Sequence, residues 1–231
     1  GVEISVESPG REVHVLGYGV DPEHGDLRQA LGDLREGRHA RNLRILAKLR
    51  DLGCPLDYEA LRRQAGGDGV VGRPHLAQAL IEAGHARNKP EAFARFLGRG
   101  APAYCDRLCL GPARALALIH AAGGLAVLAH PHLLGLPREA LRRFVRQLRQ
   151  DGLDGIEAYH SEQPANGTAA LLHLAADLGL LVTGGSDFHG ATQLNFRVGF
   201  GFGGLRVPDE CFDRLAGRLA APAPERQTGP A

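Results

Sequence analysis

The stretch LLVTGGSDFHG, at residues 180–190, indicates both the class of fold and the kind of site. Its apolar opening, residues 180–183, is typical of a buried strand, and glycines and polar residues follow at once. Asp187 and His189 therefore stand where a strand runs out into a loop, which is where α/β proteins bind their ligands. We interpret this pair as part of a metal site.

A second apolar run, residues 125–129, ends in the same way. It leads directly into His130-Pro131-His132, so an imidazole again follows a predicted strand. Two strands that both end in ligand residues suggest one metal site facing one end of a sheet or barrel. His130 is taken as a ligand, and His132 is interpreted as an ordinary loop residue.

Two further candidate ligands lie in the first twenty residues. Alternating apolar and polar residues predict a hairpin that turns at 8–10, and Glu3 and His14 fall on its strands. Three imidazoles and two carboxylates suit Zn²⁺, Mn²⁺ or Fe²⁺ better than Ca²⁺ or Mg²⁺. A carboxylate can also bridge two ions. The expected metal ligands are Glu3, His14, His130, Asp187 and His189.

The remaining pattern predicts an α/β body with a helical insertion. Leucines repeat at helical spacing from residue 26 to 97 without an intervening strand, whereas short strands and amphipathic helices alternate afterwards, which is typical of parallel βα units. The predicted strands are 125–129, 154–158 and 180–183, and the predicted helices between them are 112–122, 137–150 and 164–178. The predicted domains are 1–25 with 107–220 for the body, 26–106 for the insertion, and 221–231 for a tail.

The composition is that of an ordinary globular enzyme. The 231 residues are 44% hydrophobic and carry a net charge of +1, so no global field attracts nucleic acid or an anionic membrane. No apolar run approaches the roughly 20 residues of a membrane span, and no signal peptide is evident. The four cysteines form no C-x-x-C pair. We expect a cytoplasmic enzyme without an obligatory protein partner.

At this point the residues match a family. The chain resembles the PHP family of polymerase and histidinol phosphatase domains through four motifs that occur in order along nearly its whole length. They are GVE at 1–3, HVLG at 14–17, AHP at 129–131 and SDFH at 186–189. The resemblance implies a distorted barrel of about seven βα units, with the site at the carboxyl ends of its strands, as in other βα barrels.

The family's chemistry is hydrolysis of phosphoesters. The resemblance implies two or three divalent ions, with manganese expected first and zinc or iron as alternatives, and a metal-activated hydroxide as nucleophile. Asp187, His189 and His130 would take the catalytic roles. The family pattern also contains an H-x-H, an Asp and a D-H that this chain lacks, and the resemblance implies that these would precede Gly1.

Two further segments resemble one subgroup of this family. The sequences GRPH at 72–75 and GAPAY at 100–104 are similar to a subgroup that contains nucleoside 3′,5′-bisphosphate phosphatases and 5′→3′ exoribonucleases. Arg73 and His75 would open a helix, where backbone N–H groups favour a phosphate. The alternative is a solvated arginine and a capping histidine. The expected substrate contacts are Arg73, His75, Tyr104 and His160, which follows strand 154–158.

The sequence therefore predicts an enzyme that removes the 3′-phosphate of nucleoside 3′,5′-bisphosphates, with short 5′-phosphorylated RNA as a further substrate. Two alternatives stay open: another PHP phosphatase, such as one for histidinol phosphate, or a non-catalytic metal-binding module. The helical insertion argues against the first alternative. The retained Glu3, His130, Asp187 and His189 argue against the second.

Overall fold

The computed structural model describes residues 1–8, 11–66, 71–188, 197–202 and 204–221. The chain divides into two units, Gly1–Leu27 with Leu110–Ala231, and Arg28–Cys109, and each is described by itself. Residues 9–10 of the hairpin turn predicted at 8–10, His189, and nearly all of the predicted tail lie outside the described residues.

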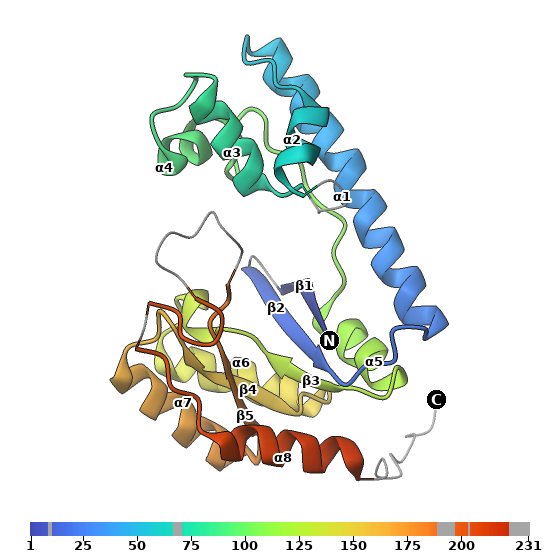
Figure 1. Cartoon of the computed structure of the whole chain (residues 1–231), viewed down its shortest axis with the longest axis vertical. Coiled ribbons are helices and arrows are strands. Elements are labelled where there is room, and N and C mark those ends of the chain that lie inside the picture. The colour runs from blue at the N-terminus through green and yellow to red at the C-terminus, as the bar shows by residue number, and fades with distance from the viewer. Residues whose placement is uncertain (9–10, 67–70, 189–196, 203, 222–231) are drawn as a thin grey trace. The chain divides into compact units, whose positions relative to one another are not determined.

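A mixed sheet of five strands forms the centre of the first unit (Figure 1). In order across the sheet the strands are β1 (Val2–Ser8), β2 (Arg11–Tyr18), β3 (Leu125–Leu128), β4 (Gly155–His160) and β5 (Leu181–Gly185). Strand β2 is antiparallel to β1 and to β3, whereas β3, β4 and β5 are parallel. The predicted hairpin and parallel units are confirmed. The described strands pair in this single order, and their closure into a barrel is not seen.

Burial along the strands decides which side chains are available for chemistry. Ile4 and Val6 of β1 and Val13 and Val15 of β2 are almost fully buried. Because side chains alternate along a strand, their polar neighbours project from the other face. All four residues of β3 are buried, but β5 is only partly buried because it stands last in the sheet order. The run at 180–183 was predicted to be a buried strand; Leu180 and Thr183 are buried, whereas Leu181 and Val182 are only partly buried.

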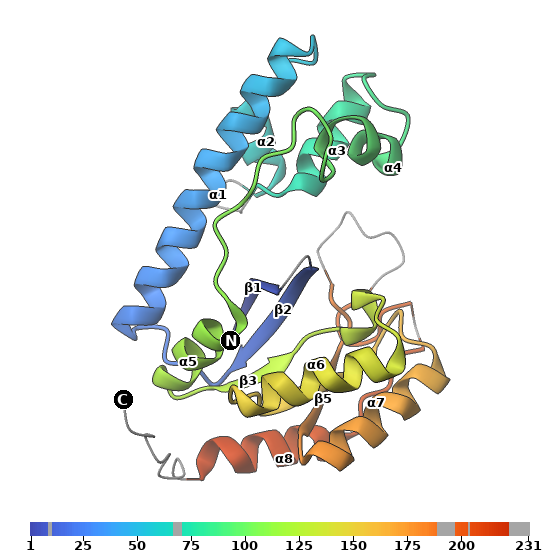
Figure 2. The ribbon, with the colours of Figure 1, turned by 180° about the vertical axis from the view of Figure 1, so that it is seen from behind.

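The described part of the first unit also contains α-helices that follow or precede its strands. They are α5 (Pro112–Ala121), α6 (Arg138–Gln150), α7 (Ala165–Leu178) and α8 (Asp209–Ala220). Helices α5, α6 and α7 confirm the three predicted helices of the βα units, and Figure 2 shows α6, α7 and α8 beside the strands. Helix α7 packs on β4 and α8 packs on β5. The helices thus support the sheet, and the sheet positions the polar residues at the ends of β3, β4 and β5.

The described part of the second unit contains helices and has its own core. Its elements are α1 (Gly25–Asp51, whose first residues belong to the first unit), α2 (Tyr58–Gln64), α3 (Arg73–Glu82), α4 (Lys89–Ala92) and a π-helical turn (Phe93–Leu97). Leu49, Leu61, Leu76 and Leu80 are fully buried in this core. No described helix of the chain has the length and apolar character that crossing a membrane requires.

A buried polar contact fixes the loop before α3. The side-chain amide of Asn42, on α1, is 1% exposed and donates a hydrogen bond of 2.8 Å to the carbonyl oxygen of Val71. A buried amide group is costly unless it is paired, so this bond holds the start of α3 against α1. The first turn of α3 carries Arg73 and His75, two of the predicted substrate contacts.

Candidate metal centre

Three of the predicted ligands converge in the first unit. Glu3 Oε1 lies 2.7 Å from His14 Nδ1 and 3.4 Å from His130 Nε2. The two imidazole nitrogens are 3.1 Å apart. Three potential ligand atoms on different parts of the chain therefore face one common point.

Strand pairing explains this convergence. In the β1–β2 register Glu3 is opposite Leu16, so Glu3 and His14 are diagonal neighbours on the same face. In the next pair Val15 is opposite Leu128, and the amide of Ala129 donates to the carbonyl oxygen of His14 at 3.0 Å. His130 follows Ala129 immediately and is thereby brought beside His14.

The backbone of His130 is strained and is held by a buried carboxylate. Its φ is 26°, and Asp187, with φ of 54°, is the other non-glycine residue with positive φ in the described chain. Such conformations cost about 1–3 kcal/mol and persist where neighbouring groups hold them. The amide of His130 donates to Glu157 Oε2 at 2.7 Å, and Glu157 is only 5% exposed. Burial is the main cause that raises the pKa of Glu157 to about 7.

Replacing Glu157 with alanine should loosen this arrangement. The buried N–H of His130 would lose its acceptor, which costs about 1–3 kcal/mol of unfolding free energy. Positioning groups of this kind are worth about 10–100-fold in metal affinity, so Mn²⁺ binding should weaken by that factor. Glu157→Gln keeps an acceptor oxygen and should lose less, and Glu139→Ala, at an exposed position of helix α6, is the control. Chemical denaturation and calorimetric Mn²⁺ titration measure both effects, and wild-type affinity in Glu157→Ala would contradict the role.

Mutual hydrogen bonding sets the protonation of the cluster without a metal. The pKa of Glu3 is held well below its ordinary range by hydrogen bonds to His130 and then to His14. Burial opposes charge on His14, but hydrogen bonds to Glu12 and Glu3 outweigh it and raise the pKa to about 9. The pKa of His130 is also raised, because Glu3 outweighs the opposing effect of burial. The site thus favours positive charge beside Glu3, whether that charge is carried by protons or by a cation.

The residues present fit a divalent metal. His14 Nε2 lies 3.2 Å from Glu12 Oε1, a contact that would place the proton of a neutral ring on Nε2 and leave the Nδ1 lone pair toward Glu3 and His130. The three ligand atoms are 2.7–3.4 Å apart, close to the roughly 3.3 Å expected between tetrahedral ligands. One carboxylate and two imidazoles are typical ligands of Mn²⁺, Fe²⁺ and Zn²⁺.

A second group of potential ligands consists of His132, His160 and Glu162. The His132 and His160 rings are 4.7 Å apart, and the His160 and His130 rings are 5.9 Å apart. Both ring nitrogens of His132 are buried and lack a hydrogen-bond partner among the described residues. Burial, followed by His160 and His130, lowers the pKa of His132 to about 4. The interpretation of His132 as an ordinary loop residue overlooked this group.

His160 connects this group to Asp187. The ring is buried, and its Nδ1 accepts a hydrogen bond of 3.2 Å from the amide of Glu162, so a neutral ring carries its proton on Nε2. Burial lowers the pKa of His160 and favours this neutral form. Nε2 lies 4.0 Å from Asp187 Oδ2. His160 therefore directs an N–H donor, unpaired among the described residues, toward the end of β5.

The predicted contacts on the second unit have local roles of their own. His75 Nδ1 accepts a hydrogen bond of 3.0 Å from the amide of Gly72, so His75 caps helix α3, which was the alternative interpretation. Burial and then Lys89 lower its pKa. A neutral His75 thus has its proton on Nε2. The carbonyl oxygen of Tyr104 accepts a hydrogen bond of 2.7 Å from Lys48. Substrate contact by Arg73, His75 and Tyr104 stays a prediction.

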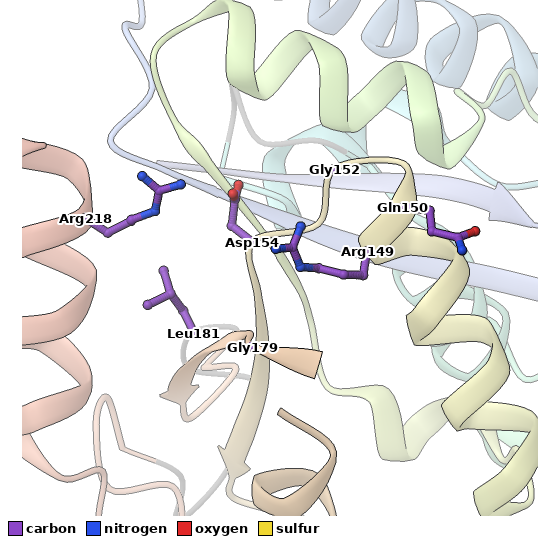
Figure 3. Close-up of a pocket in the computed structure, with 7 residues that line it drawn as sticks. All are labelled: Arg149, Gln150, Gly152, Asp154, Gly179, Leu181 and Arg218. Carbon is purple, nitrogen blue, oxygen red and sulfur yellow. The ribbon is translucent and has the colours of Figure 1, made fainter. Parts of the chain in front are cut away.

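A cavity of about 390 Å³ lies at the other end of the parallel strands (Figure 3). It is lined near the starts of β4 and β5 by Asp154 and Leu181, with Arg149 of α6 and Arg218 of α8. Asp154 Oδ2 already binds His120 Nε2 at 2.7 Å and accepts from the amide of Ala126 at 2.8 Å. This carboxylate fixes the fold, and the cavity is at the end opposite to the predicted ligands.

No family model matches the chain, but known proteins are similar to it. A 5′-3′ exoribonuclease of Haemophilus influenzae is 33% identical over 82% of this chain and 68% of its own length. A 3′,5′-nucleoside bisphosphate phosphatase of Chromobacterium violaceum is 30% identical over 82% of this chain and 66% of its own length. The chain therefore spans about two thirds of the length of these relatives.

A third relative and a solved structure extend the comparison. A phosphoribosyl 1,2-cyclic phosphate 1,2-diphosphodiesterase of Eggerthella lenta is 32% identical over 90% of this chain and 77% of its own length. A structure from Bifidobacterium adolescentis, assigned as a metal-dependent phosphoesterase, superposes with a TM-score of 0.77 and 28% identity. That superposition covers 94% of this chain and 74% of the other.

Proposed function

This chain belongs to the PHP-type metal-dependent phosphoesterases, and we propose that it hydrolyses the 3′-phosphate of nucleoside 3′,5′-bisphosphates, with short 5′-phosphorylated RNA as a further substrate. The observation that carries the proposal is the convergence of Glu3, His14 and His130 on one point. The names of the relatives from H. influenzae and C. violaceum support the substrate class.

Glu3, His14 and His130 would hold a divalent ion, and Asp187 and His189 are proposed as further ligands. When bound, the ion lowers the pKa of a water molecule and draws charge from the phosphoryl oxygens. Two or three ions, with manganese as the preferred metal, and a barrel of about seven βα units form the finer part of this proposal.

The chain's own residues supply orientation and proton transfer. His160 Nε2–H, buried and directed toward Asp187, would donate to a phosphoryl oxygen and orient the group that is cleaved. Asp187 Oδ2, 4.0 Å from that donor, would accept the proton of the attacking water. Glu157 would keep the His130 ring in place through the His130 amide.

Arg73 is proposed to bind the second phosphate of the substrate. It stands in the first turn of α3, where a helix favours an anion, and its guanidinium group can bind two phosphate oxygens at once. Arg73→Ala should raise KM for adenosine 3′,5′-bisphosphate about 10–100-fold, because a hydrogen bond to a charged group contributes about 1.5–3 kcal/mol. KM for a simple phosphate monoester should change little. Steady-state kinetics on both substrates measures the difference.

Two matched variants sharpen this test. Arg73→Lys keeps the charge but loses the two-pronged geometry, so it should fall between wild type and Arg73→Ala. Arg62→Ala removes a surface arginine from α2 of the same unit and should leave both substrates unaffected. An equal rise of KM for the bisphosphate and the monoester in Arg73→Ala would exclude a second-phosphate role.

The proposed function is tested by product analysis with a panel of substrates. With Mn²⁺, the protein should convert adenosine 3′,5′-bisphosphate to adenosine 5′-monophosphate faster than it cleaves histidinol phosphate. A phosphoribosyl 1,2-cyclic phosphate joins the panel as the second candidate, because the E. lenta relative is similar over 90% of this chain. Preference for that cyclic ester would replace the proposed substrate, and metal binding without turnover of any ester would indicate a non-catalytic module.

A further inference from the structure

A short turn at residues 197–202 exposes apolar side chains. Val198 is 70% exposed, Phe200 59% and Phe202 65%. The turn is closed by two hydrogen bonds of 2.9 Å between the backbones of Arg197 and Gly201. Gly201 itself is buried, with φ of 55°. The exposed rings therefore stand on a defined backbone turn.

This turn is anchored at the end of β4, whose last residue is His160, and at the segment after β5 that carries Asp187. The amide of Gly199 donates to Ser186 Oγ at 3.2 Å, and Ser186 directly precedes Asp187. Ser161 directly follows His160, and its hydroxyl donates to the carbonyl oxygen of Ser186 at 3.3 Å. Gly201 packs so closely on Ser161 that a Cβ at position 201 would overlap the serine hydroxyl. The aromatic turn thus adjoins His160 and Asp187, the two residues proposed to contact the phosphate and the attacking water.

Exposed aromatic rings at this place suit a nucleobase. Single apolar side chains on a surface are common, but two phenylalanines on one short turn beside a polar site form a concentrated apolar surface. Stacking of a base on an aromatic ring contributes about 5–150-fold in affinity per base and tolerates any base, because every base has a π-face. A nucleotide joins such a base to the phosphate that His160 and Asp187 would receive.

We propose that the 197–202 turn is the nucleobase platform of the substrate site, with Phe200 and Phe202 stacking on the base of a nucleotide whose phosphate is held near Asp187. This inference rests on the proposed function and adds a determinant of its substrate class. The platform selects nucleotides over other phosphate esters and discriminates little among the four bases.

Kinetics on substrates with and without a base test the platform. Phe200→Ala should raise KM for adenosine 3′,5′-bisphosphate about 5–100-fold. It should leave ribose 3,5-bisphosphate, which lacks the base, within about twofold of wild type. Phe212→Ala removes a phenylalanine that is 71% exposed on α8, and this control should behave as wild type on both substrates. Equal KM changes for both substrates in Phe200→Ala would overturn the proposal.

A binding measurement separates failure of the platform from failure of the proposed function. The chain contains no tryptophan, so Phe200→Trp introduces a single indole that keeps an aromatic face on the turn. Adenosine 5′-monophosphate should quench its fluorescence, and ribose 5-phosphate should not. Absence of quenching would overturn the platform. So would dimerisation of the wild type with rising concentration, if Phe200→Ala abolished it and left KM for adenosine 3′,5′-bisphosphate unchanged. If the wild type hydrolyses neither bisphosphate but the nucleotide still quenches the fluorescence of Phe200→Trp, the proposed reaction is wrong and the platform is supported.

Discussion

Replacement of Glu3 by glutamine is expected to lower turnover of adenosine 3′,5′-bisphosphate about a thousandfold, which corresponds to about 4 kcal/mol of lost transition-state stabilisation. Glu3 Oε1 faces both His14 Nδ1 and His130 Nε2, so its charge is shared by the whole candidate metal centre. Glutamine keeps the shape but removes the negative charge and brings an N–H₂ group that cannot bind a cation. Steady-state kinetics at saturating Mn²⁺ measures the loss.

An exposed glutamate elsewhere in the chain provides the control. Glu139 lies in the first turn of α6 and is exposed, and Glu139→Gln makes the same chemical change outside the cluster of Glu3, His14 and His130. This variant should stay within about twofold of wild type, because surface substitutions usually have small effects. If Glu3→Gln retained more than a tenth of wild-type turnover, the charge of Glu3 would not be essential.

Removal of the metal is expected to abolish turnover, and Mn²⁺ should restore it. Without a cation the site is held by protons shared among Glu3, His14 and His130, and these groups cannot activate water as a divalent ion does. Because an ion that binds only the folded chain stabilises it, Mn²⁺ at a hundred times its Kd should add about 2.7 kcal/mol to the unfolding free energy.

Dialysis against EDTA, followed by Mn²⁺ titration with kinetics and thermal unfolding, measures both effects. The Glu3→Gln variant should show a much smaller rise of Tm with Mn²⁺ than wild type, since it lacks one ligand. Full turnover in EDTA would exclude a catalytic metal. An equal rise of Tm in both proteins would place the stabilising ion elsewhere.

Local signals in the sequence were enough to predict much of the secondary structure. Helix α2 (Tyr58–Gln64) lies within the stretch predicted to be helical, and Asp57 caps its start: the amide of Glu59 donates to Asp57 Oδ1 at 2.9 Å. The β1–β2 hairpin followed from strict alternation of apolar and polar residues. Helix α8, in contrast, was not predicted as an element. None of its residues is fully buried, although Phe212, Leu215 and Leu219 repeat at helical spacing in its sequence.

The candidate site was predictable only where ligands follow strands. Glu3, His14 and His130 were recognised by their places on or after apolar runs, and the structure brings these three together. The sequence did not reveal that Glu157 holds the backbone of His130. This role depends on the burial of Glu157 and on the positive φ of His130, and both are properties of the tertiary structure. His132, interpreted from the sequence as an ordinary loop residue, lies in a 3₁₀ turn (Pro131–Leu134) and its ring is 4.7 Å from that of His160.

The aromatic turn at 197–202 shows a further limit of sequence reasoning. Its glycines and phenylalanines follow no strand or helix period, so they carry no signal for a site. Only the bonds of Gly199 to Ser186 and of Ser161 to Ser186 reveal that the turn adjoins the predicted ligands. Such contacts join residues far apart in the sequence, so only the tertiary structure reveals them.

The location of the metal tests the central claim most directly. Crystals of the protein soaked in Mn²⁺ and measured by anomalous diffraction should show a manganese peak bounded by Glu3 Oε1, His14 Nδ1 and His130 Nε2. The same experiment on Glu3→Gln should lose or greatly weaken that peak. A wild-type crystal with no manganese among these three atoms, or with the three side chains facing apart, would contradict the account.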